Sequence, residues 1–240
     1  MISSKENIKF KKLKKLSLKK YRDFFKEFLV FGEHLVQEAL VKKAVIEVYT
    51  INPNREGILI SEKLMKELNN NKILYSVCAL CKINNKPLKS DQILVMDDIQ
   101  DPGNAGTLLR SACAFGFKHI FSSEKTVDFY NEKTIRSSQG AIFHLFLERG
   151  NILKFLELAK NDNYTIFSTS VNKKNVNLDD KSFFEQKNKK ILILGNEGAG
   201  ISSSIQETSE YFIHIDINDI ESINVGVAGS ILMYLLRNKI

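Results

Sequence analysis

Three short segments of the chain carry polar and charged side chains directly after apolar runs. The first supplies Asn104 and Arg110, the second a lone carboxylate, Glu197, and the third Ser222 and Asn224. Glycines beside these residues leave the backbone open to a ligand. Hydrogen-bond donors and acceptors, one cation and one anion together indicate a binding or catalytic site. The segments are DDIQDPGNAGTLLR (97–110), GNEGAG (195–200) and NDIESINVG (218–226).

The glycine spacing of the second segment differs from two known phosphate-binding patterns. A P-loop has the pattern G-x-x-x-x-G-K-[ST], and the dinucleotide fingerprint has G-x-G-x-x-G. Gly195, Gly198 and Gly200 are spaced G-x-x-G-x-G. Because Glu197 would repel phosphate, the loop favours a ligand that is uncharged or cationic where it meets this carboxylate. A tight turn before a helix at 202–210 is the purely structural alternative.

The second block of the chain predicts the elements that position these segments. Near-continuous apolar runs that alternate with amphipathic stretches indicate the α/β class, with a mostly parallel sheet and helices on both faces. Ligands of such sheets bind beyond the carboxyl ends of the strands, where the three segments would meet. The expected strands are 93–99, 119–123, 141–148, 164–171, 191–195 and 211–217, and the expected helices include 106–116, 151–161 and 224–236.

Capping residues predict where two of these helices begin. Asn104 is expected to cap the helix that carries Arg110, and Ser222 or Asn224 is expected to cap the last helix.

A smaller α/β block precedes this sheet. The polar, proline-containing segment 81–92 is expected to be a linker, so we predict one domain over residues 1–85 and a second over 91–240. The smaller block has expected strands at 28–32, 45–51 and 72–77, and expected helices at 33–43 and 61–71, the latter opened by Ser61.

Composition limits the class of protein. With 240 residues, of which 43% are hydrophobic, the chain can bury a substantial core. No apolar stretch reaches the roughly 20 residues that a bilayer requires, and the lysine-rich start lacks the apolar region of a signal peptide. We therefore expect a cytoplasmic protein without a membrane anchor.

Cysteines and histidines predict neither disulfides nor a metal site. Three cysteines are too few for a disulfide framework. Cys78 and Cys81 have a C-x-x-C spacing, but without a second pair or matched histidines they are expected to pack as apolar residues. His34, His119, His144 and His214 share no metal-ligand spacing.

The net charge of +7 is unevenly distributed. Residues 1–90 hold 19 Lys+Arg and 9 Asp+Glu, a balance of +10, whereas residues 91–240 hold 16 and 19, a balance of −3. The densest basic segment is 9–22, where the spacing of Leu13, Leu16 and Phe24 predicts a helix with one apolar and one cationic face. Such a face suits a polyanion, although a lysine-rich solvated helix has the same composition.

The three motifs, in this order, resemble those of the SpoU family. They lie in LVMDDIQDPGNAGTLLRSACAFGF (94–117), ILILGNEGAGIS (191–202) and IDINDIESINVGVAGSILMYLL (215–236). Members of this family are S-adenosylmethionine-dependent RNA ribose 2′-O-methyltransferases of the SPOUT class. The resemblance implies a C-terminal trefoil knot that binds the cofactor, an RNA substrate from rRNA or tRNA, a basic RNA-binding domain at the front of the chain, and a homodimer.

The resemblance also implies which residues act. Arg110, donated by the partner subunit, would orient the ribose 2′-hydroxyl and stabilise the developing alkoxide, because a protonated arginine is a poor base. Glu197 would position Asn104 or the substrate ribose. The residues implied in catalysis are Asn104, Arg110, Glu197, Ser222 and Asn224, and those implied in cofactor binding are Gly195, Asn196, Gly200, Ile215, Ile223 and Asn224.

Two positions depart from the family pattern, and three function classes follow. Asp216 stands where the family often has proline, and Ile223 where it often has leucine, a nearly volume-conserving change. The favoured class is an RNA 2′-O-methyltransferase. A catalytically silent RNA-binding or ribosome-assembly protein on the same fold is the alternative, with Asp216 as its sequence support. A nucleotide-dependent α/β enzyme of another kind is disfavoured by the missing P-loop lysine.

Overall fold

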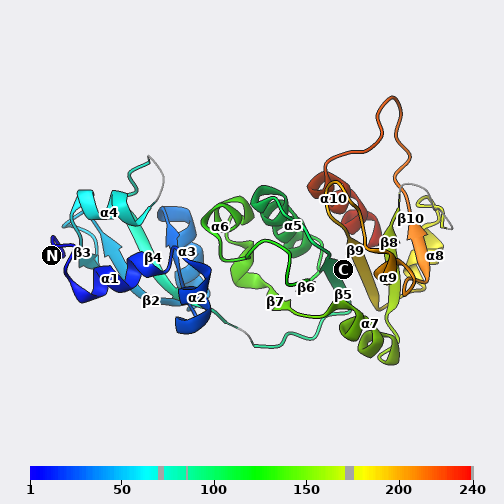
Figure 1. Cartoon of the computed structure of the whole chain (residues 1–240), viewed down its shortest axis with the longest axis horizontal. Helices are drawn as coiled ribbons and strands as arrows, with labels where there is room; N and C mark the ends of the chain where they lie inside the picture. The colour runs from blue at the N-terminus through cyan, green and yellow to red at the C-terminus, as the bar shows by residue number, and fades with distance from the viewer. Residues whose placement is uncertain (70–72, 85, 171–175, 239–240) are drawn as a thin grey trace.

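Two β-sheets lie side by side along the long axis of the molecule (Figure 1). The computed structural model describes residues 1–69, 73–84, 86–170 and 176–238. Residues 70–72, where the expected helix 61–71 ends and the expected strand 72–77 begins, and residue 171, the last of the expected strand 164–171, lie outside the described part of the chain. No helix in the described part is long and apolar enough to cross a membrane.

The first sheet has four strands in the order β1-β4-β2-β3. β4 pairs antiparallel with both β1 and β2, and β3 pairs parallel with β2. The strands are β1 (Glu27–Phe31), β2 (Val45–Thr50), β3 (Ile58–Leu59) and β4 (Val77–Lys82), and the helices of this part are α1 (Ile8–Lys15), α2 (Lys19–Phe25), α3 (Glu33–Val41) and α4 (Glu62–Leu68).

The expected strand at 72–77 is wrong, because the strand begins only at Val77. Ile73 is 53% exposed, whereas the run from Val77 to Cys81 is fully buried between two neighbouring strands. A central strand must bury both faces, and only the later run can do so. The expected linker is correspondingly shorter, since Lys82 still belongs to β4 and Gln92 already belongs to β5 (Gln92–Met96).

Two local expectations for this part are confirmed. The Ser61 side chain accepts a hydrogen bond from the backbone N–H of Leu64 and caps α4. Cys78 and Cys81 are buried in β4 as apolar residues, and burial raises the pKa of both thiols. No group of histidine, cysteine or acidic residues in the described part is arranged to hold a metal ion.

The expected single helix over the basic segment is wrong. Two short helices replace it, because α1 ends at Lys15 and α2 starts after the extended residue Leu18. The break resets the helical phase. Leu13 and Leu16 are therefore buried, whereas Phe24 is 78% exposed.

The second sheet has six parallel strands in the order β10-β8-β9-β5-β6-β7. The expected strand 141–148 is only half right, because Ala141–His144 form a 3-10 helix before β7. The remaining strands are β6 (His119–Ser122), β7 (Phe146–Arg149), β8 (Thr165–Thr169), β9 (Lys190–Leu194) and β10 (Tyr211–Ile213). The helices are α5 (Pro102–Ala114), α6 (Glu132–Ser138), α7 (Ile152–Asn161), α8 (Lys181–Glu185), α9 (Ser203–Gln206) and α10 (Val225–Leu236).

Helices cover both faces of this sheet, as predicted. Leu192 and Leu194 of β9 belong to a core with α5, α6 and α10, whereas Ile191 and Ile193 belong to a separate core with α7 and α9. This follows from strand geometry, because successive side chains point to opposite faces.

The two parts of the molecule are joined by an apolar contact and an ion pair. The Phe28 ring of β1 lies 4.7 Å from the Tyr130 ring. Arg22 of α2 is 6% exposed, and its Nε donates to an Asp128 carboxylate oxygen at 3.0 Å. A buried ion pair of this kind holds its partners in one geometry.

Candidate functional site

Glu197 lies at the centre of the loop that follows β9. Its carboxylate accepts hydrogen bonds from the backbone N–H groups of Gln100 and Asp101, both at 3.2 Å, and from Asn104 Nδ2 at 3.0 Å. All three donors follow β5, the neighbouring strand: Gln100 and Asp101 lie in the loop after it and Asn104 lies in the first turn of α5. The lone carboxylate of the glycine loop therefore ties two of the three segments together.

Asn104 extends this contact to the third segment. Its Oδ1 accepts a hydrogen bond from Asn224 Nδ2 at 2.9 Å. Asn224 also caps α10, because its Oδ1 accepts from the backbone N–H groups of Gly226 and Val227. Glu197, Asn104 and Asn224 thus form one chain of hydrogen bonds, which we call the Glu197–Asn104–Asn224 relay.

The expected capping role of Asn104 is wrong. α5 begins at Pro102, and its N-cap is Asp101, whose side chain accepts from the Asn104 backbone N–H at 2.9 Å. Proline is favoured at the first helical position because its missing N–H would have no partner there. Since Asp101 caps the helix, the Asn104 side chain is available to Glu197 and Asn224.

The glycine loop closes on itself within a few residues. Asn196 and Gly200 exchange backbone hydrogen bonds at 3.0 and 2.9 Å, and Gly200 has a φ of +71°. A Cβ on Gly195 would lie 2.3 Å from the Gly200 carbonyl carbon and from the Ile201 nitrogen. Only glycine therefore fits at position 195, where the outgoing chain passes against the returning chain.

Asn196 fixes the loop to the end of β5. Its Nδ2 donates to the Asp98 carbonyl at 2.9 Å, and its Oδ1 accepts from the backbone N–H groups of Gly198 and Ala199. Asp98 has a φ of +60°, a left-handed conformation that asparagine and aspartate tolerate better than most residues. Asn196 consequently positions the loop rather than presenting its side chain to a ligand.

The electrostatics of the site are negative. Burial raises the pKa of Glu197, but hydrogen bonds from Asn104 and from backbone N–H groups outweigh it and hold the pKa below its usual value. Asp97 is 8% exposed and accepts from the Ser202 backbone N–H at 3.0 Å. Asp101 carries a lowered pKa because of the Asn104 N–H and the Lys133 ammonium. This charge suits a cationic ligand.

Arg110 and Ser222 lie outside the relay. Arg110 is exposed and has no hydrogen-bond or ion-pair partner among the described residues. Six residues of α-helix place it about 120° around α5 from Asn104. Ser222 is exposed in the loop before α10, while Ile215 and Ile223 are partly buried.

Sequence analysis missed two residues that shape the site. Asp101 caps α5 and donates its backbone N–H to Glu197, and Asp98 provides the carbonyl that holds Asn196. The Asp-Pro pair was a usable signal for a helix start. The left-handed conformation of Asp98 had no comparable signal.

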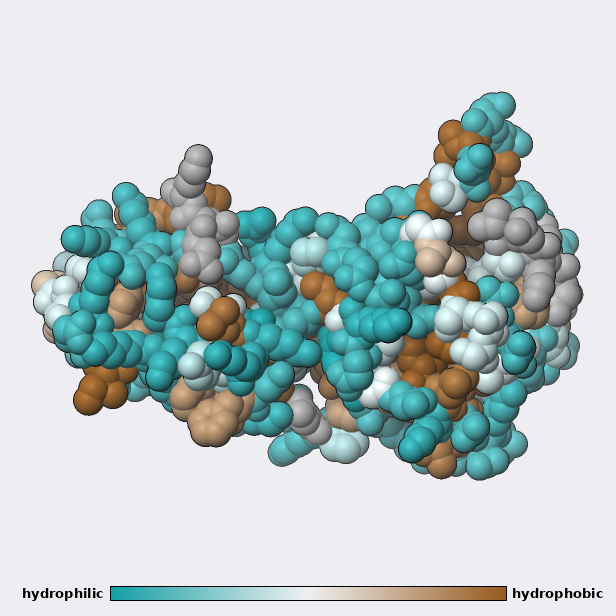
Figure 2. All heavy atoms as spheres, viewed as in Figure 1, coloured by the Kyte–Doolittle hydropathy of each residue, from teal (hydrophilic) through white to brown (hydrophobic). Residues whose placement is uncertain are grey.

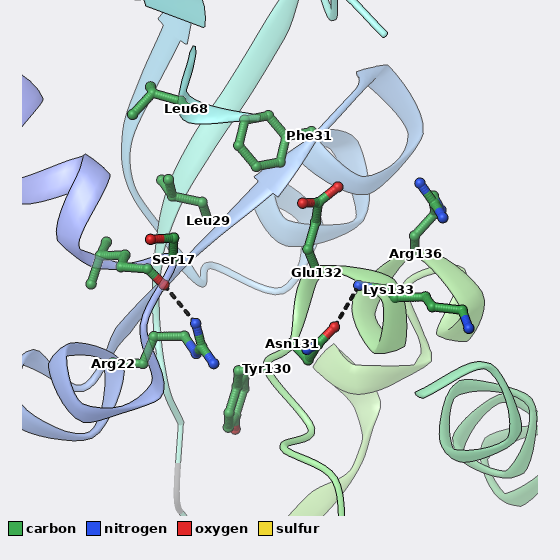
Figure 3. Close-up of a pocket in the computed structure, with 11 residues that line it drawn as sticks. Ser17, Arg22, Leu29, Phe31, Leu68, Tyr130, Asn131, Glu132, Lys133 and Arg136 are labelled. Carbon is green, nitrogen blue, oxygen red and sulfur yellow. Dashed lines mark hydrogen bonds between the residues drawn. The ribbon is translucent and has the colours of Figure 1, made fainter. Parts of the chain in front are cut away.

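A groove of about 270 Å³ lies where the first sheet meets α6 (Figure 3). One wall is apolar and includes Leu29 and Phe31, and the other carries charged side chains of α6. Lys133, one of these side chains, forms an ion pair with Asp101 at 3.0 Å. Because Asp101 contacts Glu197, the groove is connected to the candidate site through two contacts.

Comparison with protein families defines the class. The model of the SpoU rRNA Methylase family matches residues 91–234, and that of an MRM3-like substrate binding domain matches residues 7–82. The chain therefore belongs to the SpoU family. This makes it an S-adenosylmethionine-dependent RNA ribose 2′-O-methyltransferase, as the three motifs predict.

Individual relatives agree with this class along the whole chain. The 23S rRNA (guanosine(2553)-2′-O)-methyltransferase RlmP of Bacillus subtilis is 33% identical, and the match covers 98% of each chain. The AdoMet-bound rRNA methyltransferase of Sinorhizobium meliloti superposes with a TM-score of 0.85 at 22% identity, covering 98% of this chain and 96% of that one. The SpoU methyltransferase AviRb of Streptomyces viridochromogenes, in complex with AdoMet, superposes with a TM-score of 0.81 at 22% identity. That match covers 96% of this chain and 97% of AviRb. The two structures establish the shared fold.

Proposed function

We propose that the substrate of this chain is ribosomal RNA and that the acceptor is a ribose 2′-hydroxyl in the large-subunit RNA. The whole-length similarity to RlmP supports this proposal. So does the +10 balance of residues 1–90, because Lys and Arg contacts to phosphate supply much of the affinity for RNA. In this proposal residues 1–85 bind RNA, residues 91–240 carry the reaction in a knotted domain, and the protein works in the cytoplasm, where ribosomal RNA is present.

The single observation that carries the catalytic proposal is the Glu197–Asn104–Asn224 relay. It joins three segments that are far apart in sequence at the carboxyl edge of the sheet, where ligands of parallel sheets bind. We assign to Glu197 the role of orienting Asn104, and to Asn104 and Asn224 the positioning of the substrate ribose. The intact relay favours an active enzyme over a silent RNA-binding protein.

The residues present fit S-adenosylmethionine. Glu197 and the buried Asp97 provide negative charge, which suits a sulfonium cation. Gly195, with no room for a side chain, leaves backbone groups as the contacts at its position. When bound, the cofactor supplies an electrophilic methyl group. The residues that would hold it are Gly195, Gly200, Ile215, Ile223 and Asn224, and Asn196 would contribute by positioning the loop.

The chemistry requires alignment and charge stabilisation. A ribose hydroxyl is a weak nucleophile at neutral pH, so its proton must pass to water or to a neighbouring phosphate of the RNA as the oxygen attacks. A fixed guanidinium beside that oxygen stabilises the developing negative charge. Arg110 fits this role, and Ser222 would contact the substrate from the loop before α10.

Arg110 reaches such a site in a homodimer. It lies about 120° around α5 from Asn104 and has no partner among the described residues of its own chain, so we assign it to the active site of a partner subunit. α10, which packs on α5, has an exposed apolar stripe of Val227, Ile231 and Tyr234, which are 50%, 39% and 50% exposed. Their spacing places them on one helical face, and a second copy of the chain would cover that face.

Transfer of radiolabelled methyl from S-adenosylmethionine to ribosomal RNA lacking its own 2′-O-methyl groups tests the proposal. The wild-type chain is expected to give a labelled 2′-O-methylnucleoside, and both Arg110→Ala and Glu197→Gln are expected to abolish the label. A mixture of these two inactive variants distinguishes an active site shared between two subunits from one built within a single chain. If Arg110 acts across the dimer, mixed dimers contain one complete site and activity returns, whereas a site built within one chain stays inactive.

A further inference from the structure

Aromatic side chains gather on the outer side of α2. Phe24 is 78% exposed, and its ring packs edge-on against Phe25 at 5.0 Å. The Tyr21 ring stacks on the Phe25 ring, with 6.3 Å between the ring centres. A benzyl group this exposed gains no stability from burial. We call Tyr21, Phe24 and Phe25, with the lysines around them, the α2 face.

Lysines surround these rings. The Nζ atoms of Lys15 and Lys20 lie 5.5 and 4.9 Å from the centre of the Tyr21 ring, and that of Lys12 lies 5.1 Å from the Phe25 ring. Figure 2 shows hydrophobic atoms over α2 bordered by hydrophilic ones. Cations beside aromatic rings are the combination with which proteins bind single-stranded nucleic acids.

Much of the remaining positive charge of α1 is neutralised by ion pairs. Four lysines of α1 contact carboxylates, including Lys12, which also lies at the Phe25 ring. The pairs are Lys9 with Glu47, Lys11 with Glu6, Lys12 with Glu27 and Lys14 with Glu67. Lys15, Lys19 and Lys20 have no carboxylate partner among the described residues. Among the lysines of α1 and α2, the positive charge that is not paired with a carboxylate therefore lies at Lys15, Lys19 and Lys20, two of which contact the Tyr21 ring.

The opposite side of α2 is anchored. Arg22 is buried and bonded to Asp128, which belongs to the second part of the molecule. The α2 face is consequently held in a fixed position relative to the sheet that carries Glu197. A ligand on this face would be placed with respect to the candidate active site.

We propose that the α2 face binds an unpaired segment of the RNA substrate. A base stacks on Phe24, and the flanking phosphates contact Lys15, Lys19 and Lys20. This inference deepens the proposed function and rests on it. A protein partner fits less well, because lysine is depleted in the cores of protein interfaces, and a paired RNA helix offers no free base face to stack on.

The test compares Phe24→Ala with Ile8→Ala, both in the full chain. Ile8 is 85% exposed on α1, so its truncation matches the loss of an exposed apolar side chain. Fluorescein-labelled single-stranded RNA of mixed sequence, and the duplex it forms with its complement, are titrated at several salt concentrations. Stacking contributes about 1–3 kcal/mol per base, so Phe24→Ala is expected to weaken single-strand binding by about 5- to 150-fold.

The salt dependence separates stacking from charge. Phe24→Ala is expected to leave the slope of log affinity against log salt unchanged, and Phe24→Tyr to restore affinity. Lys19→Ala with Lys20→Ala is expected to reduce the slope by about 0.7 for each lost phosphate contact. Duplex binding is expected to be insensitive to Phe24→Ala.

Three outcomes overturn the inference. The first is equal single-strand affinity for the Phe24→Ala and Ile8→Ala variants, and the second is an equal loss of duplex and single-strand binding in Phe24→Ala. The third is a change of oligomeric state in Phe24→Ala with RNA affinity intact, which would assign the face to a protein partner. Failure of the proposed function is distinguishable from failure of this inference. The proposed function is tested by methyl transfer, whereas the inference is tested by comparing the RNA affinities of the Phe24→Ala and Ile8→Ala variants.

Discussion

Replacing Gly195 with alanine provides a direct test of the site's architecture. The new Cβ would lie 2.3 Å from the Gly200 carbonyl carbon, 2.3 Å from the Ile201 nitrogen and 2.4 Å from the Gly200 oxygen. Carbon contacts normally stand at about 3.5 Å, so the two passing chains must separate by about 1 Å. Backbone atoms cannot rotate away as a flexible side chain can. The Asn196–Gly200 hydrogen bonds hold them in place.

The expected cost of Gly195→Ala lies at the upper end of overpacking, about 3 kcal/mol. For a chain of this size that corresponds to a fall in melting temperature of about 6–12 °C. The loop that separates is the proposed cofactor loop, so affinity for S-adenosylmethionine is expected to fall at least about 10-fold, or about 1.4 kcal/mol. Differential scanning calorimetry and isothermal titration calorimetry measure the two effects.

Gly198→Ala is the matched control in the same loop. A Cβ there meets nothing closer than Asn196 Oδ1 at 3.7 Å, and the residue is exposed. Its melting temperature is expected to stay within the small range typical of surface substitutions. Equal melting temperatures and equal cofactor affinities for the two alanine variants would refute the close passage at Gly195.

Four further changes have defined outcomes. Asn104→Asp places a second carboxylate against Glu197, at the position where Asn104 Nδ2 donates at 3.0 Å. The rate of methyl transfer is expected to fall at least about 100-fold, the cost typical of losing one positioned donor. A near-normal kcat would contradict the role of the relay. Asp128→Ala leaves Arg22 buried without its carboxylate and is expected to lower the free energy of unfolding, measured in urea, by about 3–5 kcal/mol. In a double-mutant cycle, the same change in an Arg22→Met background should have a much smaller effect, because no buried charge is then left unpaired. Burial lowers the pKa of Lys190 to about 8, whereas a lysine in the unfolded chain titrates near 10.5. Between these pH values the unfolded state binds more protons, so the stability conferred through Lys190 rises with pH by about 3 kcal/mol. Lys190→Met should lose that rise, and parallel curves of stability against pH for the variant and the wild type would contradict it. Ile231→Asp on the exposed stripe of α10 is expected to give a monomer in light scattering and to abolish methyl transfer, and an active monomer would disprove the dimeric site.

The sequence alone determined the elements of the second sheet and the chemistry of its loops. The expected strand 191–195, for example, corresponds to the buried strand β9 (Lys190–Leu194), because continuous apolar residues fit a sheet covered on both faces. Asn104, Glu197 and Asn224 were selected from their types and from their place after such runs. Their order along the chain was sufficient to predict the family. These are local properties, which neighbouring residues specify.

Local patterns were insufficient where a tertiary contact decides between two options. The run at 72–77 and the run at 77–82 are both apolar, and only pairing with β1 and β2 selects the second. The basic segment 9–22 has helical periodicity, but the break before α2 exposes Phe24. The spacing of apolar residues predicts neither outcome, because each depends on segments distant in sequence.

The tertiary structure decided how the site residues are connected. The sequence placed Glu197 in a glycine loop, but its bond to Asn104 results from the strand order that brings β5 beside β9. The bond of Asn104 to Asn224 results from the packing of α10 on α5. Strand order follows from the packing of the whole core rather than from any single segment, so only the folded chain shows which functional groups meet.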